Sequence, residues 1–209
     1  MKVKFTNLYK IIPNKNRVLS KINNLIKKSK FVGGEEVIKF EKNFSNFTGA
    51  KYCVTVANGT DALEIAVKSL NLKKNSEVIV PVNTWISTAE AVVNNGLKLV
   101  FCDINLNDYT ICVKDLQKKI NKKTSAIIAV HLYGNPADII NIKKIIKNKK
   151  IKIIEDCAQA HGSKINKNHV GALGDVGTFS FFPGKNLGGF GDGGAIITNS
   201  KKIYEYSMR

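Results

Sequence analysis

The chain has 209 residues, of which 44% are hydrophobic and 23% are charged. These are ordinary values for a globular protein, and a chain of this length buries a sizeable core without disulfides or a structural metal. They exclude a disordered chain, a fibrous protein and a small fold that depends on disulfides.

The charge is strongly basic, with 33 Lys and Arg against 16 Asp and Glu and a formal net charge of +17. Such an excess suggests nucleic-acid binding, because basic side chains neutralise phosphates. However, only Arg17 and Arg209 are arginines, and arginine is the residue that reads guanine edges and binds phosphate bidentately. We therefore interpret the charge as a solvated, lysine-rich surface and expect no nucleic-acid partner. Tight, salt-sensitive binding to duplex DNA would reverse this interpretation.

The four cysteines show neither a C-x-x-C spacing nor a zinc-ligand spacing with histidine (Cys53, Cys102, Cys112 and Cys157). They are expected to be buried thiols in a reducing compartment, with no metal site. The first residues do not resemble a signal peptide, and no apolar run is long enough to span a bilayer. The sequence thus predicts a cytoplasmic protein without membrane contact.

In chain order, apolar residues at helical spacing predict a helix after Pro13, near residues 18–26, and another over 37–47. We place the N-terminal helical segment at 1–33 and the main domain at 34–209. β-branched runs and intervening helical patterns then predict strands at 52–56, 77–80, 97–102, 125–130 and 151–155, and helices at 60–70, 84–93, 113–120 and 137–146.

The last fifty residues follow a different pattern. A strand is predicted at 175–182, a glycine-rich loop at 183–194 and another strand at 195–198. The loop contains Gly189-x-Gly191-x-x-Gly194, which matches the dinucleotide-binding pattern in form. That interpretation is rejected because a strand follows the loop where a helix is required.

Strands that alternate with helices of this length predict an α/β fold with a mostly parallel sheet covered by helices on both faces. In such sheets, ligands bind at the carboxyl ends of the strands. This rule draws attention to the residues that follow each strand: 58–60, 81–85, Asp103, 131–134 and 156–161.

Several of these positions have both a chemical and a structural interpretation. Gly59 and Thr60 open a predicted helix and could bind a phosphate, but Thr60 could equally be a simple N-cap. Trp85 could stack on a flat ligand or pack in the core. His131 and His161 are better interpreted as core or supporting histidines than as catalysts.

Two further positions carry ionisable groups. Asp156 follows a strand apolar enough to be central, so its carboxylate needs a partner. It could cap the next segment, bind a metal or hold a cationic ring nitrogen, although strand alternation turns neighbouring Glu155 to the opposite face. Lys185, in the glycine-rich loop, is either an exposed charge or an amine available for Schiff-base chemistry.

Together these residues match what pyridoxal phosphate requires: an anion site, an aromatic ring, a carboxylate for the ring nitrogen and a lysine. The sequence resembles the DegT/DnrJ/EryC1/StrS family of sugar aminotransferases. The resemblance includes IEDCAQAHG at 154–162 and FSFFPGKNLG at 179–188, and it extends through residues 34–41, 58–63, 130–138 and 191–194.

The resemblance implies the large domain of a fold-type I pyridoxal-phosphate-dependent transferase, a three-layer α/β/α structure. It also implies a homodimer that moves an amino group, with glutamate as the expected donor, onto a keto-sugar linked to a nucleotide diphosphate. By match, Lys185 would bond to the cofactor aldehyde and carry protons, and Asp156 would hold the ring nitrogen. Trp85 would stack on the ring, and Gln159 would bond to its hydroxyl side; the phosphate would be held by Gly59, Thr60 and Ser180.

Family members are longer and end in a smaller C-terminal domain, so the resemblance implies that this chain lacks that domain. The partner subunit's phosphate-binding asparagine would lie in the missing part. The alternative function is therefore a non-catalytic or truncated protein of this fold with a binding or regulatory role. Some family members carry histidine in place of the lysine and act as dehydratases; Lys185 disfavours that branch.

Overall fold

The computed structural model describes residues 7–147 and 150–209, so the first six residues of the expected N-terminal segment lie outside it. The described chain divides into two compact units, with the boundary between Phe40 and Glu41. The first unit contains α1 (Leu8–Ile11), α2 (Lys15–Lys27) and the start of α3 (Glu35–Thr48). The helices expected after Pro13 and over 37–47 are both confirmed.

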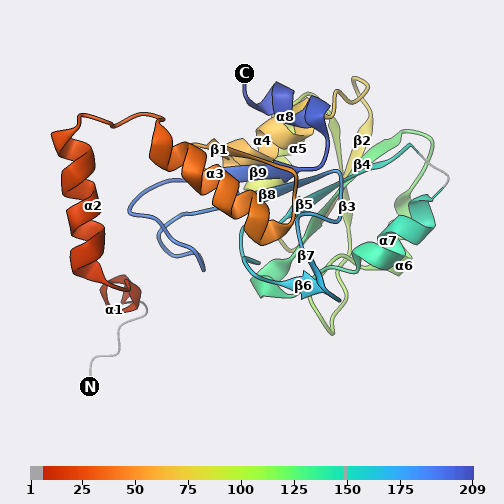
Figure 1. The fold of residues 1–209 in the computed structure, drawn as a ribbon. Coiled ribbons are helices and arrows are strands. Elements are labelled where there is room, and N and C mark those ends of the chain that lie inside the picture. Colours follow the sequence, from red (N-terminus) through yellow and green to blue (C-terminus); the bar gives the residue numbers. More distant parts are fainter. Residues whose placement is uncertain (1–6, 148–149) are drawn as a thin grey trace. The chain divides into compact units, whose positions relative to one another are not determined.

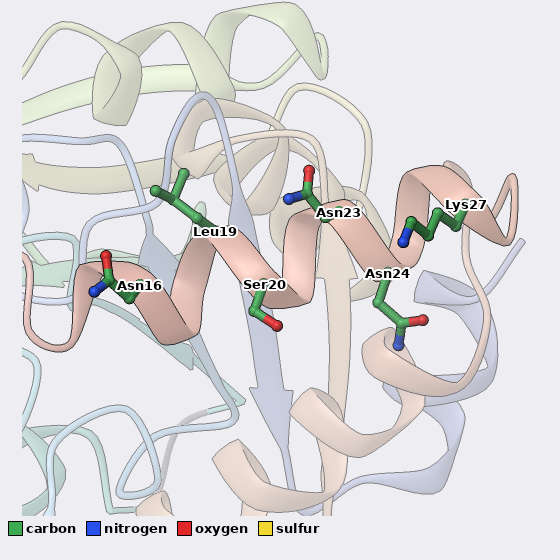
Figure 2. Close-up of a pocket in the computed structure, with 6 residues that line it drawn as sticks. All are labelled: Asn16, Leu19, Ser20, Asn23, Asn24 and Lys27. Carbon is green, nitrogen blue, oxygen red and sulfur yellow. The ribbon is translucent and has the colours of Figure 1, made fainter.

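Helix α2 carries no buried side chain. Figure 2 shows six of its residues lining an open groove: Asn16, Leu19, Ser20, Asn23, Asn24 and Lys27. Five of these six side chains are polar, which suits a solvated surface. Since all six come from a single helix, they form no enclosed site.

The second unit is built on a seven-stranded sheet (Figure 1) with the strand order β1-β9-β8-β5-β4-β2-β3. The strands are β1 (Tyr52–Val56), β2 (Glu77–Pro81), β3 (Lys98–Cys102), β4 (Thr124–Val130), β5 (Lys152–Asp156), β8 (Val176–Ser180) and β9 (Gly194–Thr198). The β3-β2-β4-β5-β8 pairings are parallel, whereas β9 runs antiparallel to both β1 and β8. The prediction of a mostly parallel sheet is confirmed.

Helices cover both faces of this sheet, as predicted. On one face α4 (Gly59–Ser69), α5 (Ser87–Asn94) and α8 (Lys201–Ser207) pack in a single apolar cluster with alternate residues of the strands. On the other face α6 (Val113–Lys119) and α7 (Ile139–Ile146) pack in a second cluster. Central strands such as β4 are buried on both sides, which explains their continuous apolar runs.

Several elements differ from the sequence prediction. Helix α5 begins at Ser87, three residues later than expected, so Trp85 lies in the preceding loop; β5 includes Asp156 as its last residue. The short hairpin of β6 (Lys164–Ile165) and β7 (Asn168–His169), the 3-10 turn η1 (Leu132–Gly134), α1 and α8 were not predicted. Among the described residues, no helix combines the length and apolarity needed to cross a membrane.

Candidate active site

A cavity of about 630 Å³ lies at the carboxyl ends of the parallel strands. Segments far apart in the sequence form its wall: the start of α4, the loop before α5, the ends of β4 and β5, and the loop after β8. All seven residues singled out as cofactor-binding line this one cavity: Gly59, Thr60, Trp85, Asp156, Gln159, Ser180 and Lys185. The fold thus brings them together, while their individual roles remain predictions.

The amino terminus of α4 lies on the cavity wall. Asn58 is the N-cap, and its side-chain oxygen accepts a hydrogen bond of 2.9 Å from the Asp61 amide. The amides of Gly59 and Thr60 have no acceptor within the helix and lie at the positive end of its dipole. A Cβ on Gly59 would lie 2.7 Å from the Cβ of Ser180, so only glycine allows this close approach.

Thr60 is not the N-cap, which removes the structural alternative considered for it. As the second residue of α4, it places its hydroxyl 2.7 Å from the Ser87 hydroxyl at the start of α5. Both side chains line the cavity together with Ser180. Three hydroxyl groups and a helix terminus therefore surround the same part of the wall, a donor set that suits phosphate.

Asp156 is almost fully buried at the end of β5, with 5% of its surface exposed. Its carboxylate accepts hydrogen bonds from the Ala158 amide at 3.1 Å and the Thr88 hydroxyl at 3.0 Å. Burial raises the pKa of this carboxyl, and these two hydrogen bonds oppose the rise only partly. A cation that binds in the cavity beside Asp156 would compensate for the buried charge.

The surroundings of Asp156 bear on its other interpretations, and its bond to the Ala158 amide shows that it caps the segment after β5. Glu155 faces the opposite side of the sheet, as strand alternation predicted, and accepts a hydrogen bond from His131 at 3.0 Å. No cluster of three potential metal-ligating side chains occurs within residues 7–147 and 150–209. The prediction that the carboxylate holds a cationic ring nitrogen is compatible with these surroundings.

Gln159 and Trp85 lie at the cavity wall in different ways. The side-chain oxygen of Gln159 accepts a hydrogen bond of 2.8 Å from the Tyr133 amide, so its NH₂ group is the part left to donate to a ligand. Trp85 exposes 72% of its surface, which excludes the core-packing interpretation. A ring at the cavity wall is available for stacking on a flat ligand.

Lys185 lies in the loop between β8 and β9 and is half-buried. The ends of this loop are held together by a hydrogen bond of 2.7 Å from the Phe181 amide to the Gly193 carbonyl. The Lys185 amide bonds to the Phe182 carbonyl at 2.8 Å, which fixes the backbone from which the side chain reaches the cavity. Its ammonium lowers the pKa of both Asp156 and His161, although burial is the largest influence on each.

Three of the residues selected after strands do not line the cavity: His131, His161 and Asp103. His131 is fully buried, and the His161 ring packs against Phe179 with a centroid distance of 5.4 Å. Both histidines therefore have supporting positions, as expected. The Asp103 amide donates to Asp115 near the end of β3, so the rule based on strand ends selected it wrongly as a ligand contact.

Sequence reasoning missed several cavity residues. Thr88 bonds to Asp156, and Asp61 and Asp192 also line the wall; Thr84, which bonds to Thr88 at 2.8 Å, lies within the range 81–85 that the sequence selected. The spacing of Thr84 and Thr88 was a usable signal, because residues four apart share one face of a helical turn. Nothing comparable marked Asp192 within the glycine-rich loop.

Comparison with known proteins identifies relatives over most of the chain. The family model of the DegT/DnrJ/EryC1/StrS aminotransferase family matches residues 14–209. A UDP-N-acetyl-3-dehydro-alpha-D-glucosamine 3-aminotransferase of Acidithiobacillus ferrooxidans is 41% identical over 191 residues, covering 91% of this chain and 52% of the relative. A dTDP-3-amino-3,6-dideoxy-alpha-D-galactopyranose transaminase of Aneurinibacillus thermoaerophilus is 43% identical over 184 residues, covering 88% of this chain and 51% of the relative.

Among solved structures, NtdA of Bacillus subtilis with bound PMP superposes with a TM-score of 0.90 at 32% identity. The match covers 99% of this chain and 47% of that one. This likeness confirms the fold-type I transferase architecture that the sequence predicted. The chain spans about half the length of the curated relatives it matches.

Proposed function

The chain belongs to the DegT/DnrJ/EryC1/StrS aminotransferase family, and from this membership and the cavity we propose a pyridoxal-phosphate-dependent nucleotide-sugar aminotransferase. It would move an amino group, with glutamate as donor, onto a keto-sugar carried by a nucleotide diphosphate. The observation that carries the proposal is the convergence of Lys185, Asp156 and the α4 terminus on one cavity. The names of the two curated relatives support the class of substrate.

The residues present fit the cofactor. Its phosphate suits the α4 terminus, where Gly59 leaves room beside Ser180 that a side chain would fill. Its ring nitrogen, when protonated, is a cation that would compensate for the negative charge of the buried Asp156 carboxylate. Trp85 supplies a stacking face, and Gln159 presents a donor to the ring's hydroxyl side.

When bound, pyridoxal phosphate supplies an aldehyde that condenses with amines and a ring that accepts electrons from the carbon being deprotonated. Lys185 would provide the amine that holds this aldehyde, and its Nζ would carry a proton between carbon atoms. Asp156 holds the proton on the ring nitrogen through its negative charge. Over the full cycle the donor leaves as a keto acid and the sugar gains the amine.

The proposal extends to the setting of the enzyme. Residues 34–209 would form the cofactor-binding domain, in a cytoplasmic homodimer whose second copy covers the cavity mouth. The exposed aromatic side chains of Trp85, Tyr133 and Phe182 support such a cover. The four cysteines are free thiols, which supports a reducing compartment.

Lys185→Ala tests the function directly. The visible absorbance of the wild-type protein with added pyridoxal phosphate is expected to show a bound-cofactor band that shifts when glutamate is added. Lys185→Ala should lose that band, because the amine that bonds to the aldehyde is gone. Lys167→Ala removes an exposed lysine in the β6–β7 turn and serves as the matched control. A glutamate-dependent shift that persists in Lys185→Ala would refute the role of this lysine.

A further inference from the structure

A buried, hydrogen-bonded pair of side chains lies on the face of the sheet opposite the cavity. His131 and Glu155 are both fully buried, and His131 Nε2 lies 3.0 Å from Glu155 Oε2. The other oxygen of Glu155 accepts hydrogen bonds from the amides of Leu173 and Gly174. Burial alone would raise the pKa of Glu155, but the interaction with His131 and the backbone hydrogen bonds from Gly171 and Gly174 lower it.

The backbone fixes which nitrogen of His131 carries the proton. Nδ1 accepts a hydrogen bond of 3.0 Å from the Ala137 amide, so Nδ1 has no hydrogen and Nε2 donates to Glu155. His131 thereby joins Glu155 on β5 to both ends of the loop 131–137. A buried carboxylate thus determines the orientation and tautomer of the ring that closes this loop.

The same loop contributes Leu132 to the cavity wall and contacts Gln159 through a backbone amide. Tyr133 lies in the left-handed region with φ of +55°, in the turn that the His131 side chain closes. Its N–H donates to Gln159 Oε1 at 2.8 Å. This bond engages the oxygen of the Gln159 amide, whereas the NH₂ group of the same side chain remains available as a donor.

We propose that His131 and Glu155 are positioning residues that hold the Tyr133 N–H against Gln159, so that Gln159 presents only its NH₂ group to the ligand. The inference deepens the proposed function and rests on it for the identity of the ligand. Burying a carboxylate is costly unless it is well hydrogen-bonded, so the pair is expected to serve through its specific geometry. Here that geometry acts on a side chain of the binding site from the far side of the sheet.

Glu155→Gln replaces the carboxylate that accepts the hydrogen bond from His131. If the new amide oxygen keeps the bonds from Leu173 and Gly174, its NH₂ group opposes the Nε2–H of His131. The ring can relieve this conflict only by moving its proton to Nδ1, which then opposes the Ala137 amide. The loop should loosen, and the Tyr133 N–H should lose its bond to Gln159.

The first arm uses the wild-type protein without cofactor. Nitrogen NMR of the His131 ring should show the Nε2–H tautomer, and hydrogen exchange should show a protected Tyr133 amide. Gln159→Ala should accelerate exchange at Tyr133 about tenfold by removing its acceptor, while Ala137 stays protected. An Nδ1–H tautomer, or a Tyr133 amide that stays protected in Gln159→Ala, would overturn the proposal.

The second arm compares variants of the loop. Glu155→Gln should accelerate exchange at Tyr133 and weaken pyridoxal phosphate binding, each about tenfold. Ser163→Ala is the control, because it removes a 2.7 Å hydrogen bond to the Gly134 carbonyl of the same loop and leaves the His131–Glu155 pair intact. Equal effects of Glu155→Gln and Ser163→Ala would mean that the pair only stabilises the loop in general, and this would overturn the inference.

A variant that does not fold and a wild-type protein that binds no cofactor can each be distinguished from a failure of this proposal. If Glu155→Gln does not fold, His131→Gln is the second variant. Its amide NH₂ can still donate to Glu155, but no atom at the position of His131 Nδ1 accepts from the Ala137 amide. This variant should accelerate Tyr133 exchange to the same extent. Protected Tyr133 in that variant would refute the proposal. If the wild-type protein takes up no pyridoxal phosphate, the proposed function fails, whereas the exchange measurements still decide the role of the pair.

Discussion

Burial of the Asp156 carboxylate lowers the stability of the folded protein but suits the binding of a cation. Its folded-state pKa is raised by burial, so above its ordinary range the unfolded carboxyl ionises more readily than the folded one. The unfolded state then binds fewer protons, and the stability of the cofactor-free protein falls as pH rises toward the folded pKa. A residue that binds a cationic ring is expected to have this property before the ring arrives.

Asp156→Asn is therefore expected to stabilise the cofactor-free protein at pH 7.5 by on the order of 1 kcal/mol. The same variant should bind pyridoxal phosphate more weakly and lose transamination, because a neutral amide does not hold a proton on the ring nitrogen. Urea unfolding and a cofactor titration measure the two effects. A variant that is less stable than wild type without cofactor would contradict the argument.

His161 gives a pH dependence of the opposite sign. Burial, with a smaller contribution from the Lys185 ammonium, lowers its pKa to about 4 from an ordinary value of about 6.5. Between these values the unfolded state binds the proton and the folded state does not, so stability falls as pH falls through this window. His161→Phe removes the titration and retains an aromatic ring beside Phe179 and Phe181.

The expected result for His161→Phe is a smaller loss of unfolding free energy between pH 6.5 and pH 4. The difference should be about 2 kcal/mol, discounted for the exposed part of the ring. Urea unfolding of both proteins across this range measures it, and the contribution of Asp156 cancels in the comparison. Parallel pH profiles would show that His161 does not remain neutral in the folded protein.

At the scale of elements, the N-caps of α4 and α7 provide a matched pair. Asn58 accepts from the Asp61 amide at 2.9 Å, and Asp138 accepts from the Asn141 amide at 3.0 Å. Only Asn58 belongs to the cavity wall. Loss of either cap should cost stability, but only one of them should affect an anion at the helix end.

Asn58→Ala and Asp138→Ala are each expected to lower the free energy of unfolding by about 1 kcal/mol. Asn58→Ala should in addition weaken binding of pyridoxal phosphate several-fold, because the first turn of α4 frays and its amides no longer converge on the phosphate. Cofactor titration of both variants separates the effects. Equal affinities of the two variants for pyridoxal phosphate would contradict the proposal that the α4 terminus binds the phosphate.

The elements that the sequence predicted are those whose apolar period is long and unbroken, such as β4, α4 and α7. The misplaced start of α5 has a local cause. Trp85 and Ile86 continue the helical apolar pattern but expose 72% and 60% of their surface in the loop and first turn. The β6–β7 hairpin pairs only two residues per strand, too few for a periodic signal.

Most of the cavity could be inferred from sequence because strand ends of a parallel sheet meet at one edge. Thr88 and Tyr133 could not, since their roles depend on distances set by packing: one reaches Asp156 across 68 residues, and the other donates through its backbone. The insertion of β9 between β1 and β8 was equally hidden. Its sequence, a short apolar run, carries no information on strand direction.

At the scale of the whole molecule, the net charge of +17 is a term that no local contact reveals. Only a few lysines pair with a carboxylate in the part of the chain that the structure describes, and those pairs are partly exposed, for example Lys152 with Asp175 and Lys201 with Glu205. Exposed pairs contribute little and are weakened by salt. The repulsion among the remaining lysines should therefore dominate the response to ionic strength.

We therefore expect added salt to stabilise this protein at pH 7.5, which is the reverse of the effect expected if surface ion pairs dominated. Raising ionic strength from about 0.02 M to about 0.2 M shortens the screening length to below 10 Å and should raise the melting temperature by about 2–4 °C. Sodium chloride and potassium fluoride at equal ionic strength should act equally if screening is the cause. A melting temperature that falls with salt would mean that the exposed pairs outweigh the repulsion of the lysines.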